Sequence, residues 1–192
     1  MVETLEDNIT RVTEAPHKLE VFLSSSADEE GEKIKDQYAP FYASISKEAN
    51  KIAYAKIAIE DGSVAEQDFA ISNTDDFAPG SFITLKMGDV NNVETVFSGL
   101  IVKHGIKVRK NRKSILTLDC RDIATTLAIT PASRYFDKNK KDSDAFKDLL
   151  KEKELPTTGI ESTDIEHEGL VQYNATDWDF IRKRANAAGQ LV

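Results

Sequence analysis

The most informative stretch of this chain reads Gly169-Leu-Val-Gln-Tyr-Asn-Ala-Thr-Asp-Trp-Asp-Phe-Ile-Arg-Lys-Arg-Ala-Asn-Ala-Ala-Gly189, and its first residues are apolar and aromatic, as in a short strand. Thr176 followed three residues later by Asp179 is the pattern of a helix N-cap, with Asp in place of the commoner Glu. Beyond the cap, Trp178, Ile181, Ala185 and Ala188 recur at near-helical spacing, so they are expected to share one apolar face of the helix. Gly189 is suited to end that helix in a left-handed conformation. The stretch therefore predicts a strand that runs straight into a helix.

Upstream of this stretch, the sequence is typical of short antiparallel strands separated by turns. Residues 81–87 alternate so that one face carries Ile83, Leu85 and Met87. Residues 114–120 alternate in the same way, with an inward face of Leu116, Leu118 and Cys120. Turn signals stand between such runs at Phe77-Ala-Pro-Gly80 and at Gly88–Asn92. This spacing predicts a small antiparallel barrel or sandwich.

The pattern changes to mixed α/β after residue 121. A short helix is predicted over residues 121–128. A second helix is expected to be capped by Asp142-Ser143 and to end at Leu155-Pro156, because proline cannot continue a helix. The apolar stripe of the second helix is Phe146, Leu149 and Leu150. The chain stops at Gln190-Leu-Val192, which has the pattern of the first residues of another strand, so we expect a fragment of a longer protein.

These patterns define the predicted fold class, which is mainly β with an α/β part (α+β). The predicted domains are a flexible N-terminus at residues 1–15, an antiparallel β-barrel at residues 16–121 and an α/β segment at residues 122–192. Residues 24–37 are rich in Ser, Asp, Glu and Lys and are expected to form a loop or an insertion.

The strand predicted at residues 93–102 is apolar on both faces. A strand buried on one side should alternate cleanly, so two interpretations are open. The strand is either a central one buried within this chain, or it exposes its second face to another subunit. On the second interpretation, Phe97 and Ile101 are candidate interface residues.

Composition limits the classes of partner. The chain has 25 Lys and Arg against 33 Asp and Glu, a net charge of −8, which disfavours general binding to nucleic acid. The basic run at residues 107–113 is expected to be a solvated turn or a contact with an acidic protein. No apolar run is long enough for a membrane anchor. Met1 to Arg11 is polar and unlike a signal peptide, so we expect synthesis in the cytoplasm, assembly into a larger particle and export, if any, with it.

Nothing in the sequence carries a recognisable catalytic motif. The single cysteine, Cys120, excludes an internal disulfide and a cysteine metal cluster. The histidines His17, His104 and His167 lack a second ligand at metal-binding spacing, so no metal or cofactor is predicted. A histidine and a carboxylate brought together only by folding stay possible, although His167 is expected to be a solvated loop residue.

Three segments resemble the Vgr spike proteins of type VI secretion and the related phage late control D tail hub proteins. The first is Phe77-x-Pro79-Gly80, and the second is the run from Phe97 through Gly99 to Val102. The third and most specific is the opening stretch, whose family-like positions are Gln172, Tyr173, Asp177, Trp178 and Phe180. Each also has a purely structural interpretation, with Trp178 as a core anchor and the Gln172-Tyr173 pair as part of the fold.

The resemblance implies a structural protein and no enzyme. In that family two related barrels per chain and three chains around an axis form a hub, so it implies a homotrimer that joins a tube protein to a spike and other baseplate proteins. The present chain would supply the first barrel and stop before the second. Two alternatives from other classes are a cell-wall hydrolase, which needs a cleft with a carboxylate or histidine of shifted pKa, and a ligand-binding β domain, which should expose clustered aromatics.

Overall fold

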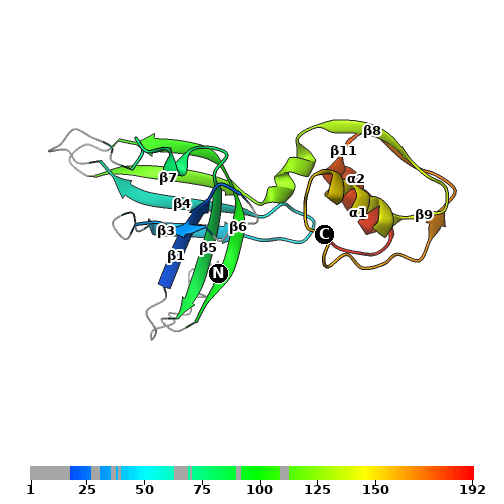
Figure 1. The fold of residues 1–192 in the computed structure, drawn as a ribbon, viewed down its shortest axis with the longest axis horizontal. Coiled ribbons are helices and arrows are strands. Elements are labelled where there is room, and N and C mark those ends of the chain that lie inside the picture. Colours follow the sequence, from blue (N-terminus) through cyan, green and yellow to red (C-terminus); the bar gives the residue numbers. More distant parts are fainter. Residues whose placement is uncertain are drawn as a thin grey trace, which may run out of the picture.

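The computed structural model describes residues 18–26, 31–35, 38, 40–62, 69, 71–89, 92–108 and 113–192. The N-terminus predicted to be flexible, at residues 1–15, lies outside these residues, as do parts of the predicted insertion and the centre of the basic run. Figure 1 shows two parts that lie side by side. A sheet unit at residues 18–121 precedes an α/β unit at residues 122–192.

The sheet unit is one antiparallel sheet of seven strands within the described residues. In chain order the strands are β1 (Lys18–Ser24), β2 (Glu32–Lys33), β3 (Pro40–Ser46), β4 (Tyr54–Asp61), β5 (Phe82–Asp89), β6 (Asn92–Lys107) and β7 (Ser114–Arg121), with a short 3₁₀ helix, η2 (Asp75–Phe77), before β5. Their order in space is β2-β1-β5-β6-β7-β4-β3. The predicted fold class is confirmed, but the sheet is open: β2 and β3 are its edges and do not pair, so the predicted barrel is not closed.

The core of the sheet unit lies on one face, where the predicted alternation is found. Ile57, Ile59, Leu116, Leu118 and Cys120 are all at most 1% exposed. Ile83 and Leu85 are buried as predicted, but Met87 is 40% exposed. Met87 pairs with Glu94 close to the β5–β6 hairpin loop, beyond the end of the core, which explains the error.

The unusual apolar pattern of β6 comes from two bulges. The register of β6 shifts against β5 at Val96 and against β7 at Val102, and each shift adds a residue that breaks the alternation. Phe97 and Ile101 are each only 1% exposed and belong to the core of their own sheet. The interpretation of β6 as a central buried strand is therefore correct, and these two side chains are not accessible to another subunit.

The α/β unit has its own hydrophobic cluster. Its elements are η3 (Ile123–Ala128), β8 (Pro131–Phe136), β9 (Lys140–Lys141), α1 (Asp142–Glu152), β10 (Glu166–His167), β11 (Leu170–Thr176) and α2 (Asp177–Ala187). Strands β8 and β11 form an antiparallel ribbon, and β9 and β10 form a second, shorter one. Phe136 of the ribbon stacks on Phe180 of α2 with ring centroids 5.3 Å apart, and α1 adds Phe146 and Leu149 to the same cluster.

Two details of α1 differ from the prediction. Asp142 is the first helical residue, and Lys141 before it makes no side-chain cap bond, so Asp142 and Ser143 are not the cap. The helix ends because Glu154 takes a positive φ of 55° and Leu155 N–H donates back to the Leu150 carbonyl at 2.9 Å. Pro156 follows this stop and does not cause it.

The two units meet at a narrow junction. Strand β7 leads directly into η3, and the Asp122 N–H donates to the Ala53 carbonyl at 3.0 Å. The end of the chain returns to the β3–β4 turn, where the Val192 N–H donates to Asn50 Oδ1 at 3.1 Å. Among the described residues, no helix is both long enough and apolar enough to cross a membrane.

Candidate functional site

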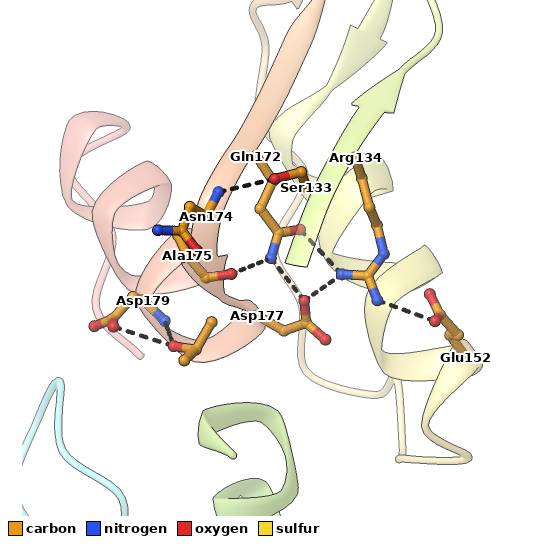
Figure 2. A network of polar contacts seen from close by, with 9 residues as sticks. Ser133, Arg134, Glu152, Gln172, Asn174, Ala175, Asp177 and Asp179 are labelled. Carbon is orange, nitrogen blue, oxygen red and sulfur yellow. Dashed lines mark hydrogen bonds and ion pairs between the residues drawn. The ribbon is translucent and has the colours of Figure 1, made fainter. Parts of the chain in front are cut away.

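The strongest of the family-like segments is organised around a buried glutamine. Figure 2 shows Gln172 of β11 pointing toward the start of α2 and toward Arg134 of β8. Its side-chain amide donates to the Ala175 carbonyl and to Asp177 Oδ1, both at 2.8 Å. Gln172 is 1% exposed, so loss of these hydrogen bonds would cost more free energy of folding than the same loss at a surface residue. They fix the turn from β11 into α2.

The same turn contains a bulge and a helix cap. The register of β11 against β8 shifts between Gln172 and Ala175, and Asn174 in the bulge has a positive φ of 41°. Thr176 then caps α2 by accepting from the Asp179 N–H at 3.1 Å, which confirms the predicted N-cap. Gly189, with a φ of 73°, follows the end of α2 as predicted.

Arg134 connects this turn to α1. Its guanidinium donates to Gln172 Oε1 at 3.1 Å, to the Asp177 carboxylate, and to Glu152 Oε1 at 3.0 Å (Figure 2). Burial alone would lower the pKa of Arg134, but the bonds to Asp177 and Glu152 outweigh it and raise that pKa. Sequence reasoning missed Arg134, although strand alternation places it on the same face of β8 as buried Phe136.

The other residues of this segment lie in different environments. Phe180 is buried in the core of the α/β unit, whereas Tyr173 is 82% exposed and has no part in that core. Trp178 is half-buried at the edge of the core and lines two hollows. One, of about 320 Å³, reaches Tyr54 and Arg121 of the sheet unit, and the other, of about 660 Å³, lies within the α/β unit.

The two remaining family-like segments meet at the core of the sheet unit. Phe77 is fully buried, and the turn after it places Pro79 before Gly80, whose φ is 101°. The Gly80 N–H donates to the Ile101 carbonyl of β6 at 2.8 Å. A side chain at Gly99 would lie 2.1 Å from the Arg121 carbonyl oxygen, so glycine is required there for the backbones to approach.

Folding also brings together a charged cluster that the sequence left open as a possibility. Asp142 of α1 is 3% exposed and accepts two bonds from Arg184 of α2, at 2.6 and 3.0 Å. His167 of β10 places its Nε2 atom 2.9 Å from Asp142 and 2.8 Å from Arg184. Contrary to expectation, His167 is not a solvated loop residue. The cluster joins α1, α2 and β10.

The chemistry of this cluster favours a structural role. Burial alone would raise the pKa of Asp142, but hydrogen bonds from Arg184 and His167 outweigh it and hold that pKa below its usual value. The carboxylate therefore stays ionised, whereas a glycosidase needs a protonated acid beside a second carboxylate. The hollow beside the cluster has a volume of about 230 Å³.

The single cysteine, Cys120, lies in the sheet unit. Burial, aided by Asp119, raises the pKa of its thiol to about 12, so it is a poor nucleophile.

We expect Asp142→Asn to weaken the acid sensitivity of this protein. A carboxylate with a lowered pKa in the folded state stabilises the protein above its unfolded pKa of about 3.9, and this contribution is lost as the pH falls through the folded pKa. The free energy of unfolding in urea should therefore fall less steeply below about pH 4 in the variant than in the wild type. Asp144→Asn, an exposed change in the same helical turn, is the control. Equal pH slopes for the two variants would contradict this assignment.

Comparison with known proteins identifies the family. A model of the Alg8 N-terminal domain matches residues 21–192, which is most of the chain. The chain belongs to the Alg8 N-terminal domain family. The family named from the sequence motifs, Vgr and late control D, is not the one whose model matches. No curated protein sequence matches this Alg8-type chain.

Solved structures show the same fold in phage tail and type VI secretion proteins. The 43 kDa tail protein of prophage MuSo2 from Shewanella oneidensis superposes with a TM-score of 0.61 at 9% identity, covering 92% of this chain and 52% of that one. The E. coli c3393 protein, a type VI secretion component similar to the T4 tail proteins gp27 and gp5, gives 0.50 at 10% identity, covering 91% and 41%. A chain of the Francisella PdpA–VgrG complex gives 0.53 at 12% identity, covering 89% and 28%.

These likenesses concern the fold of the Alg8-type domain. At such identities the side chains of any functional surface are free to differ. The domain spans about half, or less, of the solved chains that it matches. The fold expected from the motif resemblance is therefore found, and the roles of the individual motif residues stay predictions.

Proposed function

We propose that this Alg8-type domain is a structural component of a contractile injection machine, at the hub or spike between tube and spike tip. The observation that carries the proposal is the fold shared over 92% of the chain with a phage tail protein. A type VI secretion protein and a chain of a VgrG complex with the same fold support it further. The task would be to transmit force through packed surfaces, and the buried charged clusters serve that task by holding elements of the α/β unit together.

The finer parts of the proposal are three-fold assembly and partners. We infer a homotrimer that contacts a tube protein and other baseplate or spike proteins, acting within a tail-like particle. The Francisella match comes from a complex of VgrG with PdpA, which supports binding of a second protein. Because Phe97 and Ile101 are buried, the subunit contacts must involve other residues.

The mass of the protein in solution tests the trimer. Light scattering on a size-exclusion column, over a tenfold range of concentration, should give three times the chain mass of 21.4 kDa. Assembly by closed, repeated contacts should stop at three copies and not continue to larger species. A monomer at every concentration would contradict self-assembly by this chain, and a mass that rises without limit would contradict a closed ring.

A further inference from the structure

The outer face of the sheet unit, opposite its core, carries an unusual set of side chains. Strand register places Tyr54 beside Arg121, and Lys56 beside Asp119. On the neighbouring strands, Lys103 of β6 pairs with Asp119, and Tyr42 of β3 pairs with Ala58 of β4. Since these residues alternate with the buried ones, they share the outer face of β3, β4, β7 and β6. We call this set, Tyr42, Tyr54, Lys56, Lys103, Asp119 and Arg121, the basic face.

The basic face is hollowed. A depression of about 500 Å³ is lined by the six residues of the face together with their neighbours. One row beside it is made of the small residues Ala58, Thr117 and Gly105, and the Thr117 hydroxyl is turned back to donate to the Gly105 carbonyl at 3.0 Å. Tyr42 and Tyr54 at the rim are 50% and 44% exposed. The hollow has room for a few side chains of a partner.

Positive charge on this face is only partly neutralised within the chain. Among the residues that line this hollow, the three cations Lys56, Lys103 and Arg121 stand beside one carboxylate, Asp119, in a chain whose net charge is −8. Arg121 also lines the neighbouring hollow, which holds the carboxylates of Glu48 and Asp179. Asp119 pairs with Lys56 at 3.4 Å, and both side chains are exposed enough for the pair to be weak. Arg121 lies over the Tyr54 ring at 5.3 Å. Within the described part of the chain, neither Arg121 nor Lys103 has an ion-pair partner.

The positive charge continues along β6. Lys103, Gly105 and Lys107 alternate on the same face, and Lys107 begins a run that holds five Lys or Arg in seven residues, ending at Lys113. Lys107 shares its row with Ile115 and Glu60, and Glu60 pairs with Lys113 at 3.4 Å, so the charge available to a partner lies mainly at Lys103 and Arg121. Complementary charge on a partner would be attracted to these two cations, mainly at low ionic strength.

From this charge and shape we propose that the basic face docks an acidic polypeptide segment of a partner protein. Lys103 and Arg121 bind carboxylates, and the two tyrosines contact the aliphatic or aromatic side chains between them. Nucleic acid fits less well, because it needs contacts to many phosphates while the remainder of the chain is strongly negative. This inference does not depend on three-fold assembly.

Fluorescence anisotropy on the full chain tests the proposal, with a fluorescein-labelled oligoglutamate peptide containing one tyrosine as the probe. We expect saturable binding that weakens as the salt rises from about 0.05 M to about 0.3 M, since screening shortens the reach of exposed charges. Lys103→Glu should weaken binding by about tenfold, because it replaces an attraction with a repulsion at the hollow. Lys138→Glu, an equal change of charge at an exposed site in the α/β unit, should change affinity by less than about twofold.

Three results would overturn the proposal. One is the absence of saturable binding by the wild-type chain, and another is equal weakening by the two lysine variants, which would indicate attraction by overall charge alone. The third is tighter binding of a labelled oligothymidine than of the peptide, which would indicate a nucleic-acid surface. Thermal melts of both variants should match the wild type, since both lysines are exposed. Light scattering measures self-assembly, whereas anisotropy measures peptide binding. Failure of the trimer test would therefore not contradict the proposal for the basic face, and failure of the peptide test would not contradict the trimer.

Discussion

Replacing Phe97 by Asp should unfold the sheet unit. Phe97 is 1% exposed and packs in a core with Leu85, Ile101 and Leu118. Truncating a buried Phe to Ala typically costs about 3–5 kcal/mol, and a buried carboxylate adds a desolvation penalty to that loss. Since domains are stable by only about 5–15 kcal/mol, we expect loss of the cooperative melt and of most far-UV β signal in circular dichroism.

Phe41→Asp is the matched control for this experiment. Phe41 lies in edge strand β3 and is 57% exposed, so the same chemical change there removes little buried area. Its melting temperature should stay close to that of the wild type, because exposed substitutions usually change stability by less than about 0.5 kcal/mol. A Phe97→Asp variant that folded normally but failed to assemble would contradict the burial of Phe97. It would indicate that Phe97 lies at a subunit interface.

Short-range interactions explain which parts of the fold could be predicted. The Thr176 cap acts over three residues, and the left-handed Gly189 depends on its own backbone, so both can be recognised from neighbouring sequence. Alternation in β7 identified Leu116 and Leu118 as core residues for the same reason. These features need no knowledge of the remainder of the chain.

Pairing between distant segments explains what could not be predicted. The bulges at Val96 and Val102 depend on how β6 aligns with two neighbours, and they made a central strand resemble a two-sided interface. Barrel closure depends likewise on whether the edge strands β2 and β3 meet, which spacing alone does not determine.

The polar clusters are the clearest case of this limit. Arg134 contacts Gln172 and Asp177 across 38 and 43 positions of sequence, and Arg184 contacts Asp142 across 42. Sequence motifs identified Gln172 and Asp177 but not the arginine that they bind. A charged residue on the inward face of a strand, as at Arg134, is the signal that could have indicated a buried partner.

Arg134→Ala should be strongly destabilising for the α/β unit. The change leaves Asp177, whose side chain is 4% exposed, and Gln172 without their shared cation. Removing one partner of a buried ion pair typically costs about 3–5 kcal/mol, because the remaining charge is buried and uncompensated. For a chain of this size that corresponds to a fall in melting temperature of roughly 10 °C, measurable by thermal denaturation.

The matched control is Arg182→Ala in the same unit. Arg182 pairs with Asp179 at 3.2 Å, but the side chains are 43% and 45% exposed, so the loss should be below about 1 kcal/mol. A double variant, Arg134→Met with Asp177→Asn, should recover part of the lost stability, since it removes the uncompensated charge along with the cation. If Arg134→Ala melted like Arg182→Ala, the network around Gln172 would not be what holds β11, α1 and α2 together. If the double variant were no better than Arg134→Ala, the loss would come from packing and not from the buried charge.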